Sequence, residues 1–423
     1  MANARKVALK ALLEVRNQAY SNITLNKFLG EYELSGADKA LTTAIFYGVL
    51  DRTISLDYVL SRYIKTPLKK VDALALETLR IALFQIMFMD KIPQSAAVNE
   101  AVKIIKSSKC KHLSGFVNGV LRNILREGTQ LPTDNSADSL SIRYSCPKWI
   151  VESFILDYGV DNAVNLLESS IKTPPVTLRV NSIKTDASTL CEMLSGEGID
   201  AKLGKLDYSL ELLQGTDVTK CSAYHKGLFH VQDIASQTVV GVLEPKDDER
   251  VLDVCAAPGG KTFTIAQYMK NTGEIIACDL YEKRVELIKR GAGRLGLTNI
   301  TAMQNDATLY NEKLGSFDAI LCDVLCSGLG VIRRKPEIKY KDLSDYQDIT
   351  AIQLQILENS TKYLKENGRI LYSTCTLRKC ENEDVIERFL DKYPQYELKY
   401  QRTFMPHIDG SDGFYCALLQ KSR

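Results

Sequence analysis

The sequence lacks a long apolar run. Its longest apolar stretch, Ile81–Met89, contains Gln85 and reaches about half of the roughly 20 residues that a bilayer-spanning helix needs. The N-terminal segment mixes Arg5, Lys6 and Lys10 with its apolar residues, so it has no continuous apolar core of the kind found in signal peptides. We therefore expect no membrane span, no secretion signal and a cytoplasmic location.

Histidine is scarce, and the cysteines are not spaced like metal ligands. The chain has 4 His and 11 Cys, and its closest cysteine groupings, Cys322/Cys326 and Cys375/Cys380, lack the paired Cys-x-x-Cys spacing. These spacings argue against a zinc site. An odd number of irregularly spaced cysteines, in a chain without a secretion signal, predicts thiols rather than a disulfide framework.

Low-complexity tracts and internal repeats are absent as well. The composition, 45% hydrophobic and 25% charged, is typical of a soluble globular protein. A length of 423 residues predicts about two to four domains. This composition excludes a disordered, collagen-like or coiled-coil protein.

Charge of one sign is not in excess overall, but it is unevenly distributed. The formal net charge is +2; of the 54 Lys+Arg and 52 Asp+Glu, residues 1–130 carry 19 and 11, which leaves 35 and 41 for residues 131–423. A basic N-terminal part therefore precedes a mildly acidic remainder. A basic surface can track nucleic-acid phosphates, although a run of charges is more often only a solvated face.

The N-terminal part has the pattern of a helical bundle. From Ala4 to about Arg126 the apolar residues recur at spacings of three and four. Gly and Pro predict breaks between helices at Leu34–Gly36, Thr66–Pro67 and Ile92–Pro93. The polar segment Gly128–Ser136 then interrupts the periodicity. We place a domain boundary there, so that an all-α domain covers residues 1–130.

Residues 131–245 predict a small α+β module, and residues 246–423 predict an α/β domain. The module is expected to contain helices near 149–158, 162–169 and 187–194 and a strand at Val176–Val180. In the α/β domain the predicted strands are 250–255, 273–279, 300–305, 317–323 and 369–374, and the predicted helices are 261–269, 282–295, 345–365 and 383–392. This alternation indicates a mostly parallel sheet covered on both faces, and 396–404 with 414–420 reads as a terminal pair.

The segment Val251–Lys261, VLDVCAAPGGK, is a buried strand that runs into a turn of small residues and then a helix. Gly259 and Gly260 allow a ligand to approach the backbone closely, and the N–H groups at the start of the next helix can hold a polar group. The following strand ends in Asp279, which is the position of a ribose-binding carboxylate in nucleotide-binding sheets. A tight turn without a ligand is the simpler reading of the glycines alone.

Acidic residues and two cysteines end the later strands. Asp306 and Asp323 follow the third and fourth strands, at the edge where open α/β sheets bind ligands, although any one of them could be a helix N-cap. Cys326 and Cys375 lie at strand ends too, where a thiolate can act as a nucleophile. We expect the remaining cysteines considered, Cys110, Cys191, Cys278 and Cys416, to behave as small buried apolar residues.

Together these motifs resemble the RNA cytosine-5 methyltransferases, and most specifically the Sun/Fmu-type 16S ribosomal RNA methyltransferase B group. The resemblance is carried, in order, by TLRVN at 177–181, GLFHVQDIASQ at 227–237, VCAAPGGKT at 254–262, DVLCSGLGVIRRKPEIKY at 323–340, STCT at 373–376 and DGFYCALL at 412–419. It extends over essentially the whole chain. The implied fold is a Rossmann-like, S-adenosylmethionine-dependent methyltransferase domain that follows a NusB-like RNA-binding head and a small linking or RNA-binding α+β module.

The resemblance also implies a role for each matching residue. Cys375 would attack C6 of a cytosine, Cys326 would help to release the product, and Asp323 would contact N3 of the base and the cofactor. The target base would have to leave its stack to expose both ring faces. The S-adenosylmethionine site would comprise Cys255, Ala256, Ala257, Pro258, Gly259, Gly260, Lys261, Asp279, Arg284, Asp306 and Asp323.

The implied partner is 16S ribosomal RNA of the small-subunit precursor, with cytosine 967 as the implied target. Arg179, Arg333, Arg334 and Lys335 are the predicted RNA-binding residues, and the expected oligomeric state is a monomer. No residue in the chain encodes the position of the target in the RNA.

The chain departs from the family pattern at two positions. Leu325 stands where the family has proline, so the loop that orients Asp323 and Cys326 loses the fixed φ of that residue. Ile234 ends a VQDI segment where the family has VQDE, so a carboxylate is missing there. The first change puts the orientation of the loop in doubt, and the weight of the second is open.

Two alternatives remain at this point. The same catalytic residues in related enzymes modify transfer RNA or other ribosomal cytosines, so the substrate could be another RNA. The chain could instead be a non-catalytic RNA-binding assembly or regulatory protein with a degenerate methyltransferase domain. The presence of Lys261, Asp279, Asp323, Cys326 and Cys375 argues against degeneracy.

Overall fold

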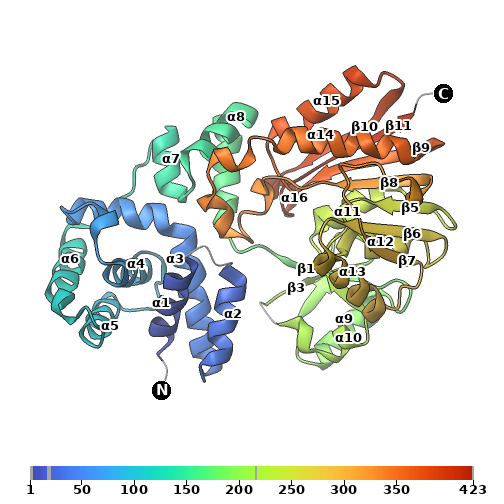
Figure 1. Ribbon diagram of the computed structural model, residues 1–423. Helices are drawn as coiled ribbons and strands as arrows, with labels where there is room; N and C mark the ends of the chain where they lie inside the picture. The colour runs from blue at the N-terminus through green and yellow to red at the C-terminus, as the bar shows by residue number, and fades with distance from the viewer. Residues whose placement is uncertain (1–2, 17–20, 215–216, 422–423) are drawn as a thin grey trace. The chain divides into compact units, whose positions relative to one another are not determined.

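The computed structural model describes residues 3–16, 21–214 and 217–421, which form two compact units. The helical unit comprises residues 1–172 and 332–341, and the sheet unit comprises residues 173–331 and 342–423 (Figure 1). This division differs from a boundary near residue 130, because the helices of residues 137–170 belong to the helical unit. Among the described residues, no helix is both long and apolar enough to cross a membrane.

The helical unit is built around one helix that is apolar on almost every side. That helix, α4 (Ala73–Phe88), packs against α1, α3, α5 and α6, as the blue-to-cyan part of Figure 1 shows. The helices of the unit are α1 (Ala4–Val15), α2 (Ser21–Glu31), α3 (Gly36–Tyr63), α4, α5 (Gln94–Lys106), α6 (Ser114–Glu127), α7 (Ala137–Tyr144) and α8 (Lys148–Ser170).

The three predicted helix breaks are confirmed, and local chemistry explains two of them. The Ser35 side chain accepts a hydrogen bond from the Asp38 N–H and caps α3, while Pro93 precedes the first residue of α5. The two helices predicted near 149–158 and 162–169 are both present, and α8 joins them across a kink. Gly159 breaks the regular geometry inside it, with φ of 78°.

The second half of the 323–340 family motif, together with the residue after it, forms the segment Ile332–Lys341, which packs with the helical unit. The Lys339 ammonium is buried and lies 3.5 Å from Asp51 Oδ1. Ser21 Oγ donates to Glu337 Oε2 at 2.9 Å, and the Tyr340 hydroxyl donates to the Leu50 carbonyl. These contacts make the segment part of the packing of the helical unit.

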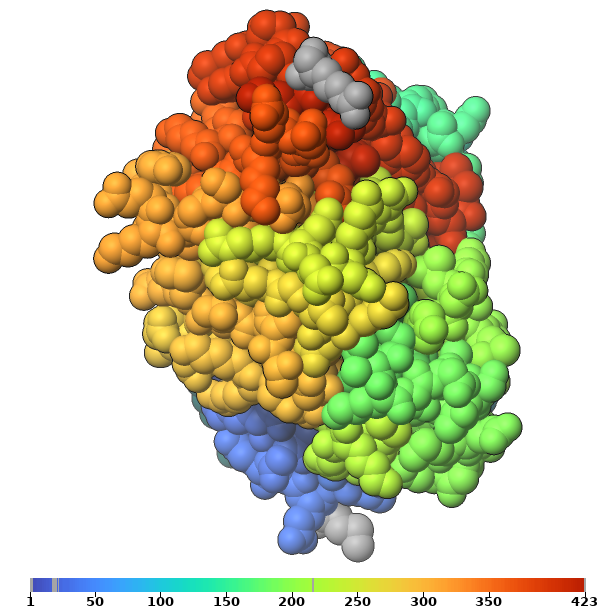
Figure 2. All heavy atoms as spheres, turned by 90° about the vertical axis from the view of Figure 1, so that its right-hand side faces the viewer, coloured from blue at the N-terminus to red at the C-terminus, as the bar shows by residue number. Residues whose placement is uncertain are grey.

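The sheet unit begins with a small antiparallel sheet of order β2-β3-β1-β4. Its strands are β1 (Val176–Val180), β2 (Ala201–Leu203), β3 (Ser209–Leu212) and β4 (Phe229–Val231), and they pack on α9 (Ala187–Gly196) and α10 (Ser222–His225). Asn181 Nδ2 donates to the Leu295 carbonyl at 2.9 Å, and Arg294 donates to the Tyr224 carbonyl. The module, green in Figure 2, thus lies directly against the yellow part of the same unit, which contains the large sheet.

The large sheet has the order β10-β11-β9-β8-β5-β6-β7. Strands β5 (Arg250–Asp253), β6 (Glu274–Asp279), β7 (Ile300–Gln304), β8 (Phe317–Asp323) and β9 (Leu364–Thr374) are parallel, and the pair β10 (Tyr396–Phe404) and β11 (Phe414–Lys421) is antiparallel. Each predicted strand is present. The helix predicted over 345–365 is shorter, because Leu343–Tyr346 forms a 3₁₀ turn and Lys365 already lies in β9.

Helices cover both faces of this sheet, as the strand–helix alternation predicts. Val251 and Ile275 point to one core with α11 (Ile234–Leu243), α12 (Gly260–Tyr268) and α13 (Glu282–Leu295). Their neighbours Leu252 and Ile276 point to the opposite core with α14 (Ile349–Ser360) and α15 (Glu383–Lys392). The parallel strands therefore end together at one edge, where their loops gather the side chains of the candidate site.

Candidate functional site

The turn between β5 and α12 needs glycine at one position and has free space at the next. Gly259 has φ of 109°, and a Cβ there would lie 2.2 Å from the Phe263 ring. A Cβ on Gly260 would meet its nearest atom, Gln232 Nε2, at 3.8 Å. The Ala256 N–H donates to the Cys278 carbonyl at 2.7 Å and ties the turn to β6. The turn therefore presents backbone rather than bulky side chains to a ligand.

The carboxylate at the end of β6 supports this turn. Asp279 is 2% exposed, and its Oδ2 accepts from the Ala257 N–H at 3.3 Å. Arg284, in the first turn of α13, lies 3.3 Å from the same oxygen and also donates to the Ala257 carbonyl at 2.9 Å. The predicted residues Asp279 and Arg284 are thus brought together with the 255–261 turn.

Asp306, the third predicted carboxylate, stabilises the turn that begins at its own position. Asp306 follows β7, and its Oδ1 accepts from the Thr308 N–H at 2.9 Å and from the Thr308 hydroxyl at 2.7 Å. Oδ1 of this half-buried side chain is therefore occupied by the turn. The contacts show that Asp306 stabilises this turn, and its role toward a cofactor stays a prediction.

The carboxylate at the end of β8 is held by a cation and a hydroxyl. Lys261 Nζ lies 2.6 Å from Asp323 Oδ2, and Ser373 Oγ donates to Asp323 Oδ1 at 2.8 Å. The Lys261 ammonium also lies 4.8 Å from the centroid of the Phe414 ring. The side chain of Lys261 is 10% exposed and that of Asp323 is 28% exposed, so the carboxylate is the member of the pair that a ligand can reach.

The two cysteines of the family motif form a pair. Cys326, after β8, and Cys375, after β9, have their Sγ atoms 3.2 Å apart. The contact with Cys375, together with burial, raises the pKa of the Cys326 thiol well above its usual value. At neutral pH Cys326 is therefore protonated and able to donate its S–H to Cys375.

Behind the thiols lies a buried polar network that the sequence did not reveal. The Glu381 carboxylate is fully buried and accepts from the Ser327 N–H at 2.8 Å and from Gln353 Nε2 at 3.1 Å. Ser327 Oγ contacts Glu381 Oε1 at 2.5 Å and Thr376 Oγ1 at 2.7 Å. Since Ser327 follows Cys326 and Thr376 follows Cys375, this one carboxylate connects the loops of both thiols.

Glycine makes a second connection between the same loops. The Gly330 N–H donates to the Cys375 carbonyl at 3.0 Å, and the Gly330 carbonyl accepts from Gly413 at 2.9 Å. A Cβ on Gly330 would lie 1.9 Å from the Gly413 oxygen, so any side chain there would push the two segments apart. The small residues of the CSGLG and DGFY segments therefore allow a close backbone approach beside the thiol pair.

A further buried carboxyl lies beneath the site. Asp253, at the end of β5, is 1% exposed, and its Oδ2 accepts from the Thr262 hydroxyl at 2.7 Å. Burial raises the pKa of Asp253 to about 7. The sequence signal was the acid inside the apolar VLDV strand, but nothing in that pattern distinguishes a buried carboxyl from one that faces a ligand.

The predicted RNA-binding residues lie in two different environments. Arg179, on β1, is 3% exposed; its guanidinium packs between the rings of Tyr208 and Tyr268, and its Nε donates to Gln267 at 3.1 Å. This burial leaves little of Arg179 for contact with RNA. The other three residues, Arg333, Arg334 and Lys335, lie in the 332–341 segment of the helical unit.

Three family models match successive parts of the chain. The NusB family matches residues 2–126, a "Methyltr_RsmF/B-like, ferredoxin-like domain" matches residues 146–219, and "16S rRNA methyltransferase RsmB/F" matches residues 240–420. The curated "Probable ribosomal RNA small subunit methyltransferase B" of Bacillus subtilis (strain 168) is 39% identical and covers 99% of both chains. The chain belongs to this methyltransferase family.

Other members and solved structures agree with this family assignment. The ribosomal RNA small subunit methyltransferase B of Pasteurella multocida (strain Pm70) is 32% identical over 100% of this chain and 96% of its own. The crystal structure of PH0851 has a TM-score of 0.83 and 25% identity, and covers 100% of this chain and 99% of its own. Pyrococcus horikoshii NSun6 with SFG shares the fold, with a TM-score of 0.61 and 23% identity over 66% of this chain and 98% of its own.

These findings confirm several sequence predictions. The family, the enzyme class of a ribosomal RNA methyltransferase, and the combination of a NusB domain, a ferredoxin-like module and a methyltransferase domain are those expected from the motifs. The domain boundaries and the roles of individual site residues stay predictions.

Proposed function

We propose that this chain transfers a methyl group from S-adenosylmethionine to C5 of a cytosine in small-subunit ribosomal RNA, with Cys375 as the nucleophile. The observation that carries the proposal is the contact of 3.2 Å between the Cys326 and Cys375 thiols at the ligand edge of the sheet. C5 of cytosine needs a covalent adduct at C6 to become nucleophilic, and a paired thiol system at this edge can form and release one.

The residues around the β5–α12 turn fit S-adenosylmethionine. The turn presents the backbone of Cys255–Lys261, with Gly259 excluding a side chain, and Asp279 offers a carboxylate at the end of the next strand. We assign the amino-acid end of the cofactor to this turn, the ribose to Asp279 and the adenine to the neighbourhood of Asp306. When bound, the cofactor supplies an electrophilic methyl group on sulfur.

Cys375 would attack C6 of the flipped cytosine. In this assignment the Cys326 thiol, whose pKa is raised, keeps its proton and would donate it to the Cys375 sulfur 3.2 Å away. The new S–C6 bond moves electron density toward C5, which then takes the methyl group. The Asp323 carboxyl, oriented by Lys261 and Ser373, would bind the N3 side of the ring and offset the charge that develops there.

Cys326 would act in the release step. Since the methyl group enters the ring face opposite Cys375, the C5 hydrogen turns toward the face on which both thiols lie. Once Cys375 is a thioether, the influence of its sulfur on the pKa of Cys326 is removed, and burial and Glu381 remain as the causes that raise it. The Cys326 thiolate, or a water that its thiol holds, would then take the C5 proton; the S–C6 bond breaks, Cys375 leaves as a thiolate, and one proton passes to solvent.

The RNA would be 16S ribosomal RNA, with cytosine 967 as the target. Support for the small subunit comes from the shared family. The basic character of residues 1–130 supports binding to RNA in general. We infer that the NusB-like head binds RNA, because phosphate contacts by Lys and Arg supply most of the sequence-independent affinity for a polyanion. The enzyme would act as a cytoplasmic monomer.

Methyl transfer from labelled cofactor to unmethylated 16S ribosomal RNA tests the proposal. Wild type should label C5 of one cytosine, and Cys375→Ala should abolish labelling. Cys326→Ala should accumulate a covalent RNA adduct that resists denaturation, while the double variant should form none. An adduct in Cys375→Ala would contradict the division of roles. RNA binding without labelling by wild type would identify a non-catalytic RNA-binding protein instead.

A further inference from the structure

The positive charge of the N-terminal head is concentrated in one helical hairpin. Residues 103–126, which cover the end of α5, the connecting turn and most of α6, contain six Lys or Arg, one His and no Asp or Glu. All six basic side chains are exposed: Lys103, Lys106, Lys109, Lys111, Arg122 and Arg126. Among the stretches of residues 1–130 that contain no Asp or Glu, this one carries the most basic residues.

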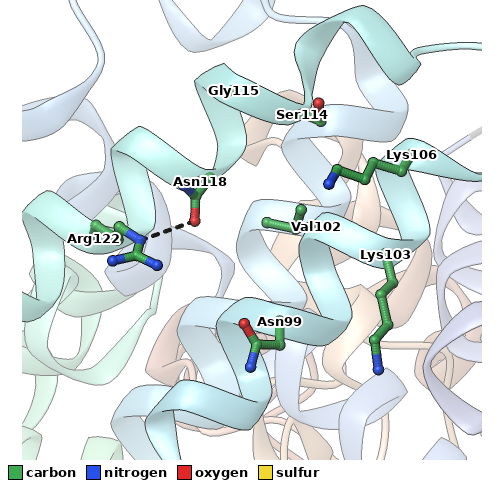
Figure 3. Close-up of a pocket in the computed structure, with 8 residues that line it drawn as sticks. All are labelled: Asn99, Val102, Lys103, Lys106, Ser114, Gly115, Asn118 and Arg122. Carbon is green, nitrogen blue, oxygen red and sulfur yellow. Dashed lines mark hydrogen bonds between the residues drawn. The ribbon is translucent and has the colours of Figure 1, made fainter.

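A pocket of ≈ 510 Å³ lies on this hairpin, between α5 and α6 (Figure 3). Its lining contains three basic residues, three hydroxyl or amide side chains and a single apolar one, and no carboxylate. The lining residues are Asn99, Val102, Lys103, Lys106, Ser114, Gly115, Asn118 and Arg122. Almost every side chain in it can donate a hydrogen bond, which suits an anionic ligand rich in acceptor oxygens.

The cations of the pocket differ in how far they are already neutralised. Lys103 pairs with Glu100 at 2.8 Å, and in Figure 3 its side chain extends away from α6. Arg122 uses its Nε to donate to Asn118 Oδ1 at 3.2 Å, which orients its guanidinium. Lys106 makes no ion pair with any described residue. Lys106 and Arg122 therefore provide two positive charges at opposite ends of the pocket.

The lining also includes bare backbone. Gly115 is a helical residue on α6 and lines the pocket, and a Cβ built on it has no atom within 4 Å. Glycine in a helix costs stability relative to alanine, and internal packing does not account for this residue. The space beside Gly115 is open to a ligand that approaches the helix closely.

From these observations we propose that the α5–α6 pocket binds the sugar–phosphate backbone of the substrate RNA, with Lys106 and Arg122 on phosphates and Ser114 and Asn118 on phosphate or ribose oxygens. The inference rests on the proposed function, which makes RNA the substrate. An acidic protein is the less favoured ligand, because protein interfaces have apolar centres and are poor in lysine. Here Val102 is the single apolar residue of the lining.

Equilibrium binding to unmethylated 16S ribosomal RNA across a series of KCl concentrations tests the pocket. Lys106→Gln and Arg122→Gln should each lower the slope of log K against log salt by about 1, and the double variant should lower it by about 2. The matched control is Lys39→Gln, which removes one exposed lysine from α3 of the same unit and should leave the slope as in wild type.

A second pair of variants tests the open space without removing a native charge. Gly115→Glu and Gly115→Gln add side chains of equal size where no atom lies within 4 Å, so both should fold. The carboxylate should weaken RNA binding roughly tenfold relative to the amide, because it repels phosphate. Equal affinities for these two variants, or slopes for Lys106→Gln and Arg122→Gln that match Lys39→Gln, would overturn the proposal.

The outcomes separate this inference from the proposed function. A wild-type chain that binds RNA through the pocket but transfers no methyl group contradicts the proposed function and leaves the pocket in place. If wild type transfers methyl groups and every pocket variant binds RNA as wild type does, the proposal that this pocket binds RNA is overturned and the proposed function stands. Loss of binding to a purified acidic ribosomal protein, with RNA affinity unchanged, would identify a protein partner and also overturn it.

Discussion

The thiols of Cys326 and Cys375 lie 3.2 Å apart although 49 positions separate the two residues in the chain. They meet because β8 and β9 are parallel neighbours, so that the loops after both strands leave the sheet at the same edge. The contact with Cys375, together with burial, raises the pKa of the Cys326 thiol, so Cys326 keeps its proton at neutral pH. The proposed roles, with Cys375 as the nucleophile and Cys326 as a proton carrier, depend on this proximity of the two sulfurs.

Oxidation should inactivate the enzyme reversibly. The two Sγ atoms need to close from 3.2 Å to about 2.05 Å to form a disulfide, which a small loop movement allows. Treatment with diamide should abolish methyl transfer and yield a peptide that links Cys326 to Cys375, and a reductant should restore both. Cys221→Ser, in the small module, should respond like wild type. Inactivation without the linked peptide would count against this prediction.

Lys261 should matter for turnover through Asp323. In Lys261→Met the carboxylate loses its cation at 2.6 Å and keeps only the Ser373 hydroxyl. We expect kcat/KM to fall by about 10- to 100-fold, which corresponds to about 1.4–2.7 kcal/mol for this partly exposed pair. Lys261→Arg should retain more activity, since it keeps the charge. Equal activity of Lys261→Met and wild type would exclude a role for the ion pair.

Glu381 should be required for the geometry of the two thiol loops. Glu381→Gln keeps the size of the side chain but replaces one acceptor oxygen with a donor that faces Ser327 or Gln353. The variant should lose about 1–3 kcal/mol of stability in urea unfolding and most of its turnover. The exposed Glu387→Gln, on α15, is the matched control and should behave like wild type. A fully active Glu381→Gln would mean that the network is dispensable.

Asp253 should make stability depend on pH in a predictable direction. Burial raises the pKa of Asp253 in the folded protein from 3.8 to about 7. Below about pH 4 the carboxyl is protonated in both states and does not lower the free energy of unfolding. As pH rises from 4 toward 7, the unfolded state loses this proton more readily than the folded state, so the free energy of unfolding falls. Asp253→Asn should therefore gain stability relative to wild type between pH 4 and 8, by up to about 4 kcal/mol. Urea unfolding at several pH values measures this difference.

Asp318→Asn provides a control with the opposite sign. Burial raises the pKa of Asp318, but hydrogen bonds from Lys365 and from the Arg250 N–H lower it further, so that this pKa lies below its usual value. Asp318 therefore stabilises the fold above about pH 4, and its asparagine variant should lose stability relative to wild type as pH rises. Parallel pH trends in the two variants would contradict this assignment.

Leu325→Pro should raise turnover. Leu325 is 47% exposed, and its carbonyl accepts from Gln353 Nε2 at 2.9 Å, a bond that proline keeps. Its N–H makes no backbone hydrogen bond within the part of the chain that the structure describes, so proline removes no such bond. The fixed φ should stiffen the loop that carries Asp323 and Cys326. Turnover equal to or below wild type would show that leucine holds this loop equally well.

Local sequence patterns were sufficient for most of the elements and for the edge of the sheet at which the candidate site residues lie. The spacing of apolar residues predicted α13 and α15 to the residue, and β8 as well, because these periodicities depend only on which face of an element is buried. The acidic residues and cysteines at strand ends followed from the same reading, since parallel strands bring their carboxyl ends to one edge.

By itself the sequence determined the order of domains, the strands and helices, and the family to which the chain belongs. The tertiary structure alone decided which side chains meet: that Cys326 contacts Cys375, that Glu381 is buried behind both, that Arg179 is enclosed by two tyrosines, and that residues 332–341 pack with the helical unit. The reason is physical. Periodicity records which face of an element avoids water, whereas contacts between distant loops depend on strand order and on how closely backbones can approach.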